Sequence, residues 1–237
     1  MVCYSLPVFS QNNLQAENAL ICYHKAKKLL DERQFNKLDS IIAYSDFSSS
    51  IFYKLKQWDN YLDNLDIRIQ TYTRKYDNNK VFKLIDSAEF VIKKNKVSSL
   101  KYLASLDYDL GLYYYLNSQF DSSLNHYNKA LKKRIELYGE NHLDVANCYM
   151  GIGLIYDSKS DYDKALENLY KSLEIRRNIL GEENAMVAHS ISNIGYTYRN
   201  KSDLNKALEL MLNALDIRKK VLGEESYDVA QSYSSLG

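Results

Sequence analysis

The sequence contains one proline, Pro7, and no glycine before Gly111, although it is 237 residues long. All-β folds need a tight turn every ~8–12 residues, and such turns depend on glycine and proline. Their scarcity argues against an all-β fold and favours long helices joined by short turns. Apolar residues make up 46% of the chain, which is enough for a folded core and excludes a disordered chain.

Excess charge, cysteine motifs and long apolar runs are also missing. Lys and Arg total 31 against 30 Asp and Glu, so the net charge of +1 gives no general attraction to nucleic acid or to an anionic membrane. The cysteines, Cys3, Cys22 and Cys148, form no C-x-x-C motif, and we expect the last two to be buried as small apolar residues. No apolar run reaches the ~18 residues of a membrane span.

The first ten residues are uncharged and mostly apolar. Ser10, with Val8 two residues before it, suits a signal-peptidase site, and the ending Val-Phe-Ser-Gln resembles signal-peptide ends of one bacterial group. A basic n-region is missing, however, and the apolar stretch is short. Residues 1–13 are therefore either a signal-peptide remnant or a disordered N-terminus. The first case predicts an exported or periplasm-facing protein, and the second a cytoplasmic one.

A repeat with a period of 42 residues dominates the rest of the sequence. This spacing separates the members of five series, which are Gly111, Gly153, Gly195 and Gly237; Gly139, Gly181 and Gly223; Tyr114, Tyr156 and Tyr198; Val145, Val187 and Val229; and Arg134, Arg176 and Arg218. The period persists upstream in a weaker form, since Tyr72 and Ala88 precede Tyr114 and Ala130 by the same distance. The chain is therefore expected to be built from one supersecondary unit used several times.

Each unit has the pattern of two helices. In residues 143–181, apolar side chains recur at spacings of three and four on both sides of a polar break at 158–161. We predict that Asp161 caps the second helix and that Gly181 ends it in a left-handed conformation. Applied along the chain, the pattern predicts helix pairs at 14–56, 57–97, 98–139, 140–181 and 182–223, and a half unit at 224–237. A single pair cannot bury its apolar face, so neighbouring pairs should stack into an all-α solenoid.

These units resemble the tetratricopeptide repeat (TPR). The family pattern is carried in one unit by Tyr149, Ile152, Gly153, Tyr156, Ala165 and Leu169, and in the next by Ile194, Gly195, Tyr198, Ala207, Met211 and Ala214. The 42-residue length, and the Leu180-Gly181-Glu182 segment before Val187-Ala188, resemble the kinesin-light-chain subtype. The resemblance implies a right-handed superhelical solenoid of antiparallel helix pairs.

The resemblance is strong over 98–237 and weak over 14–97, so the chain is divided into kinesin-light-chain-like TPR repeats and divergent TPR-like helical pairs. The last repeat stops after its first helix, and we therefore expect the chain to be the N-terminal part of a larger bacterial protein. Gly153 and Ala165 should lie where paired helices approach most closely. The series Arg134, Arg176 and Arg218 lies near the end of the second helix, which in this family faces the outer surface.

No residue pattern predicts catalysis, a cofactor or a metal site. The four histidines form no H-E-x-x-H motif, and Gly151-Ile152-Gly153 lies inside a helix and not in a phosphate-binding loop. We therefore predict that the protein is not an enzyme. The arginine series is basic, but acidic residues of the same helices offset it, so no nucleic-acid partner is predicted.

The resemblance implies a concave groove lined by the first helix of each pair. The groove candidates are Tyr108, Leu112, Tyr115, Asn147, Met150, Leu154, His189, Asn193, Tyr196, Arg199 and Asn200. Asn193 matches a position at which the family often holds the ligand backbone. The tyrosines offer large contact areas at a low cost in conformational entropy. They are either anchors for a ligand or packing residues against the next helix.

The resulting prediction is a non-catalytic scaffold that binds a protein or peptide ligand, with no membrane span. The alternative is the sensor or regulatory region of a larger signalling protein or enzyme, by analogy with proteins that carry a CHAT-protease-like or histidine-kinase domain, with the effector domain beyond Gly237. Apolar surface on the incomplete last repeat would also allow self-association.

Overall fold

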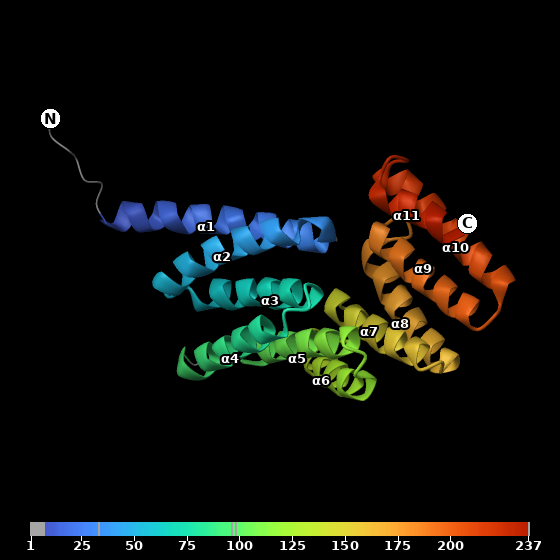
Figure 1. The fold of residues 1–237 in the computed structure, drawn as a ribbon, viewed down its shortest axis with the longest axis horizontal. Helices are drawn as coiled ribbons and strands as arrows, with labels where there is room; N and C mark the ends of the chain where they lie inside the picture. Colours follow the sequence, from blue (N-terminus) through green and yellow to red (C-terminus); the bar gives the residue numbers. More distant parts are fainter. Residues whose placement is uncertain (1–7, 33, 96, 98, 237) are drawn as a thin grey trace. The chain divides into compact units, whose positions relative to one another are not determined.

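The computed structural model describes residues 8–32, 34–95, 97 and 99–236, which form helices and connecting turns and no β-strand. The chain divides after Leu116 into two compact units. The first unit contains α1 (Val8–Asp31), the 3-10 turn η1 (Phe35–Lys37), α2 (Leu38–Lys54), α3 (Trp58–Arg74), α4 (Asn78–Asn95) and α5 (Ser99–Leu116) (Figure 1). The second contains α6 (Phe120–Tyr138), α7 (Leu143–Ser158), α8 (Tyr162–Leu180), α9 (Ala185–Asn200), α10 (Leu204–Leu222) and α11 (Tyr227–Leu236).

The predicted helix pairs are confirmed, because each of the five predicted ranges contains two helices and the half unit contains one. Helix α1 begins at Val8, earlier than the predicted start at residue 14. Residues 1–7 lie outside the described residues, so the interpretation of the N-terminal segment as a signal-peptide remnant stays a prediction. The division of the chain at residue 98 into divergent and kinesin-light-chain-like repeats also stays a prediction.

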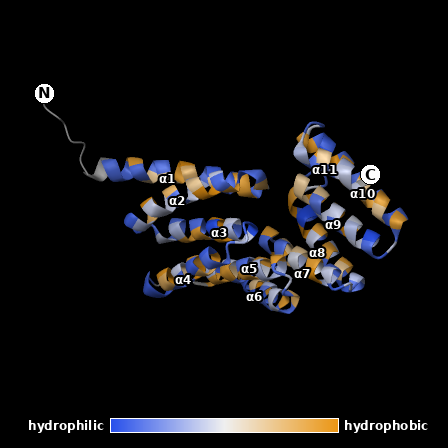
Figure 2. Cartoon of the chain, viewed as in Figure 1, coloured by the Kyte–Doolittle hydropathy of each residue, from blue (hydrophilic) through white to orange (hydrophobic). Residues whose placement is uncertain are grey.

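Within the second unit, helices that follow one another in sequence pack together, α7 on α8, α8 on α9 and α9 on α10. Apolar and polar residues alternate along these helices with helical periodicity, and the apolar faces are buried (Figure 2). Gly153 lies at the closest approach of α7 to α8, as predicted. A Cβ atom there would lie 2.7 Å from Leu169 Cγ, which is too short, and 3.1 Å from the Ala165 carbonyl oxygen, which is a tight contact with the backbone.

The helix ends follow the predictions with one correction. Asp161 caps α8 and Asp203 caps α10, each accepting a hydrogen bond from the backbone three residues ahead. Gly181 has the predicted positive φ of 78°, but its ψ of 171° is extended and not left-handed helical. This combination of φ and ψ is accessible almost only to glycine, and it directs the chain away from α8 toward α9.

The prediction for the arginine series is wrong. Arg134 and Arg176 are only 6% and 2% exposed, so they do not face the outer surface. Arg176 lies under α9, where its Nη1 donates to Ser190 Oγ at 2.8 Å and to the Met186 carbonyl at 3.3 Å. The small residue at position 190 leaves room for the guanidinium and gives its Nη1 an acceptor, which offsets part of the cost of burial.

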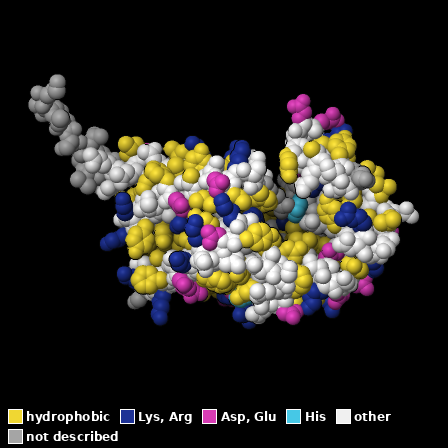
Figure 3. Space-filling view, in the orientation of Figure 1, with side chains coloured by type: hydrophobic (Ala, Val, Ile, Leu, Met, Phe, Trp, Pro, Cys, Tyr) yellow, Lys and Arg dark blue, Asp and Glu magenta, His cyan; other side chains and the backbone are white. Residues whose placement is uncertain are grey.

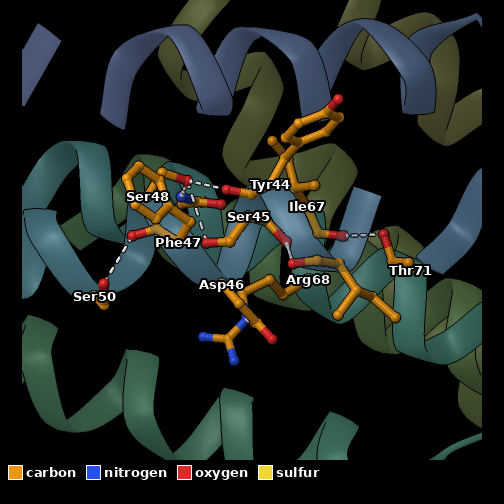
Figure 4. Close-up of polar contacts among 11 residues, drawn as sticks. Tyr44, Ser45, Asp46, Phe47, Ser48, Ser50, Ile67, Arg68 and Thr71 are labelled. Atoms are coloured by element: carbon orange, nitrogen blue, oxygen red, sulfur yellow. Dashed lines mark hydrogen bonds and ion pairs between the residues drawn. The ribbon is translucent and has the colours of Figure 1, made fainter. Parts of the chain in front are cut away.

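The first unit has its own apolar core and a polar seam between α2 and α3, which the sequence pattern did not indicate (Figure 4). Ser45 and Ser48 are fully buried and donate to carbonyl groups of their own helix. Asn64 of α3 donates to the hydroxyl of Ser48, and at the edge of the seam Arg68 Nε lies 2.8 Å from Asp46 Oδ1. These bonds join the two helices where apolar packing would be expected.

Candidate peptide-binding surface

The structure brings together the groove candidates of α7 and α9, which are first helices of consecutive repeats. Two contacts join the helices at residues 43 apart. Asn193 Nδ2 lies 3.5 Å from Met150 Sδ, and Asn200 Nδ2 donates to Asp157 Oδ2 at 2.9 Å. The candidates on these two helices therefore form one continuous surface, which we call the α7–α9 face.

The middle of the α7–α9 face is polar. Asn193 Nδ2 lies 3.3 Å from His189 Nδ1 on the same helix. Within the part of the chain that the structure describes, no group donates a hydrogen bond to Asn193 Oδ1. Arg199 is exposed and makes no ion pair with a described residue, and its guanidinium lies 5.0 Å from the centroid of the Tyr196 ring. The face thus presents an amide acceptor and a cation on the same helix.

Tyr196 is held by the next repeat. Its hydroxyl donates to Ser235 Oγ of α11 at 2.7 Å, and its side chain is half-buried. This contact favours the packing alternative for Tyr196, because an anchor residue would keep its polar end available for the ligand. The residue still contributes one ring face, which is covered by Arg199.

Three candidates on α7 are largely committed to the fold. Asn147 Oδ1 accepts a hydrogen bond from Arg176 Nη2 at 2.7 Å, and Met150 is only 5% exposed. Leu154 packs at the edge of the apolar core. Arg176 was missed as a neighbour of this face, although its recurrence at the repeat period was a visible signal. These residues shape the floor of the α7–α9 face and leave α9 to supply its accessible groups.

The remaining candidates lie in the first unit. Tyr108, Leu112 and Tyr115 are half-buried on α5. Tyr113 between them is buried, and its ring meets that of Phe82 edge-on at 5.1 Å.

Side chains with other chemistry have structural roles. His142 caps α7, because its Nδ1 accepts a hydrogen bond from the Asp144 amide at 3.1 Å. Burial raises the pKa of the Cys148 thiol to about 11, which keeps it protonated and unreactive near neutral pH. Among the described residues, no three His, Cys, Asp or Glu side chains are placed to hold a metal ion. None of the described helices is both long and apolar enough to cross a membrane.

Comparisons with known proteins agree with this geometry. Two family models, both described as tetratricopeptide repeat, match residues 102–178 and 187–228. The crystal structure of BtubC (BKLC) from P. vanneervenii has a TM-score of 0.60 and 18% identity, and the match covers 95% of this chain and 81% of that one. A second crystal structure contains nearly identical TPR-like repeats of a kinesin light chain from Podosopora anserina. It has a TM-score of 0.55 and 15% identity, and the match covers 86% of this chain and 96% of that one. These likenesses show the fold, and no curated protein sequence matches significantly.

Proposed function

Because the chain belongs to the tetratricopeptide repeat family, with kinesin-light-chain-like repeats, we propose that it is a non-catalytic scaffold that binds an extended peptide on the α7–α9 face. Tetratricopeptide repeats serve in general as protein-interaction scaffolds. The absence of catalysis and of a nucleic-acid partner remains part of this proposal.

The observation that supports this site is the open acceptor of Asn193 together with the exposed cation of Arg199 on the same helix. An extended peptide has unpaired backbone amides, and each needs an acceptor when it leaves water. Asn193 Oδ1 can accept such an amide, while His189 holds the other end of the side chain in place. Arg199 can then pair with a carboxylate or carbonyl oxygen of the same peptide.

A peptide selection tests the proposal. Peptides selected from a random library on the intact chain would be titrated against wild type, Asn193→Ala and Arg199→Ala by fluorescence anisotropy. We expect at least a tenfold weaker affinity for either variant, about 1.4 kcal/mol, which is the size of one hydrogen bond to a charged or well-placed group. Lys171→Ala is the control, because Lys171 lies on α8 in an exposed pair with Glu167. Equal affinity for all four proteins would contradict the proposal.

The same surface would serve the alternative, in which the chain is the sensor region of a larger signalling protein or enzyme. In that case peptide binding on the α7–α9 face is the input, and the effector lies elsewhere. The selection experiment applies to both cases, since each requires the Asn193 and Arg199 contacts.

A further inference from the structure

Aromatic side chains gather in the first unit where α2 ends and α3 begins, and yellow side chains lie at this end of the unit in the space-filling view (Figure 3). The ring of Tyr53 meets that of Tyr61 at 5.3 Å and 61°, and that of Trp58 at 5.5 Å and 78°. The rings of Trp58 and Tyr61 are also almost perpendicular, at 84°. Such mutually inclined rings present faces in several directions around one point.

A surface hollow of about 410 Å³ lies beside this cluster. It is lined by Tyr53, Tyr61, Asp86, Ser87, Phe90 and Val91. Val91 is buried and forms its floor, whereas Tyr53 and Phe90 are 48% and 56% exposed at its walls. The volume is within the range of small-ligand sites, so the hollow can take a side chain and part of the backbone that carries it.

The charge of the hollow favours a cation. Asp86 is exposed, and it forms no ion pair with any residue that the structure describes. Aromatic faces carry a negative quadrupole that attracts cations, and Lys94 Nζ already lies 5.2 Å from the centroid of Phe90. In the described part of the chain, no lysine or arginine covers the ring of Tyr53, Trp58 or Tyr61. The exposed ring of Tyr53 and the carboxylate of Asp86 are therefore available to a cation from outside, which would share Phe90 with Lys94.

We propose that this hollow binds the alkylammonium group of a lysine side chain on a protein partner. Tyr53, Tyr61 and Phe90 would surround the ammonium group, and Asp86 would balance its charge. A trimethylated ammonium should bind more tightly than a primary one, because it is less strongly hydrated and contacts more ring surface. The site is in the first unit and does not depend on the α7–α9 face.

The test compares two probes of the same shape. They are the N-acetyl methylamide of trimethyllysine and its neutral isostere, in which a carbon atom replaces the ammonium nitrogen. Trp58 is the only tryptophan in the chain, so its fluorescence reports directly on this site in a titration of the intact protein. We expect the cation to bind at least tenfold more tightly than the isostere. Equal binding of both probes, or no binding of either, would overturn the proposal.

Variants locate the binding. Asp86→Asn removes the charge and no ring, and Phe90→Ala removes an exposed ring, so both should fold, with a thermal melt as the check. Each should weaken cation binding at least threefold, and Asp86→Asn should leave the isostere unaffected. Glu89→Gln is the matched control, because Glu89 is exposed on the same helix but does not line the hollow. Full cation affinity in both site variants would place the binding elsewhere and overturn the proposal.

Discussion

Arg176 of α8 donates a hydrogen bond of 2.8 Å to the hydroxyl of Ser190 on α9, and this contact joins two consecutive repeats inside the protein. The same guanidinium reaches Asn147 of α7 at 2.7 Å, so one side chain ties three helices together. The equivalent contacts in the neighbouring repeats are Arg134 to Cys148 Sγ at 3.4 Å and Arg218 to Ser232 Oγ at 2.6 Å. The repeat thus places an arginine at these three junctions, buried at Arg134 and Arg176 and half-buried at Arg218, with its acceptor 14 residues later.

We expect Arg176→Ala to lower the free energy of unfolding by about 2–4 kcal/mol. The change removes hydrogen bonds from a charged donor, leaves Asn147 and Ser190 without it, and opens a cavity. Urea denaturation would measure the loss. Arg177→Ala is the control, because Arg177 is partly exposed in a surface pair with Glu182, and its loss should cost less than about 1 kcal/mol. Equal costs for the two variants would contradict this role of Arg176 in joining the three helices.

Gly153 and Gly195 occupy equivalent positions but should respond differently to a Cβ atom. At Gly153 the new atom would meet Leu169 Cγ at 2.7 Å, whereas at Gly195 the nearest atom is Cγ of the flexible Met211 at 3.1 Å. We expect Gly153→Leu to lower the free energy of unfolding by about 1–3 kcal/mol or more through overpacking. Gly195→Ala should be nearly neutral, because the higher helix propensity of alanine, about 1 kcal/mol, offsets the contact. Thermal melts measure both variants. A Gly153→Leu variant that melts at the same temperature as wild type would refute the placement of Gly153 against α8.

The turns inside the helix pairs contain non-glycine residues with positive φ. These are Tyr76, Ser118, Ser160 and Ser202, at φ values of 56°, 58°, 62° and 70°. We expect Ser160→Gly to raise the stability by about 0.5 kcal/mol, because glycine adopts this conformation without the steric cost paid by other residues. Ser158→Gly is the matched control, since Ser158 is in the last turn of α7 and glycine there should destabilise by up to about 1 kcal/mol. A loss of stability in both variants would count against the prediction.

The repeat period was sufficient to predict the helices, because apolar spacing and end signals agree in the units at 140–181 and 182–223. Asp161 and Asp203 are good examples, since each cap is visible in sequence and needs only the backbone of its own helix. The cap of α7 was missed because His142 is an uncommon capping residue. Its signal was present in the spacing, as Asn184 occupies the equivalent position and caps α9.

The burial of Arg176 could not be predicted from its own helix. A basic residue near a helix end suits a solvent-exposed position equally well, and its burial depends on an acceptor supplied by the next helix. The role of Tyr196 was open for the same reason, because its partner Ser235 lies 39 residues further along the chain. Sequence spacing predicts which face of a helix is apolar, whereas the pairing of polar groups between helices depends on tertiary packing.

Cys148 replaces the serine found at positions 190 and 232, and we expect Cys148→Ser to make the protein less sensitive to alkali. Burial raises the pKa of the folded thiol to about 11, against an ordinary value of 9. Between these two values the unfolded thiol is ionised and the folded thiol is protonated, so the unfolded state binds fewer protons. The free energy of unfolding therefore falls as the pH rises from about 9 to 11, by up to about 2 kcal/mol from this group.

The difference between wild type and Cys148→Ser isolates this effect from other groups that titrate at high pH. Burial also raises the pKa of Tyr23 to about 12, so both proteins should lose stability above pH 10. At pH 7 the two should be similar, because a serine hydroxyl can accept from Arg134 as Ser190 does from Arg176. Urea denaturation at pH 7, 9 and 10.5 should show the variant gaining relative to wild type as the pH rises. A difference that stays constant with pH would mean that the Cys148 thiol ionises as readily in the folded chain as in the unfolded one.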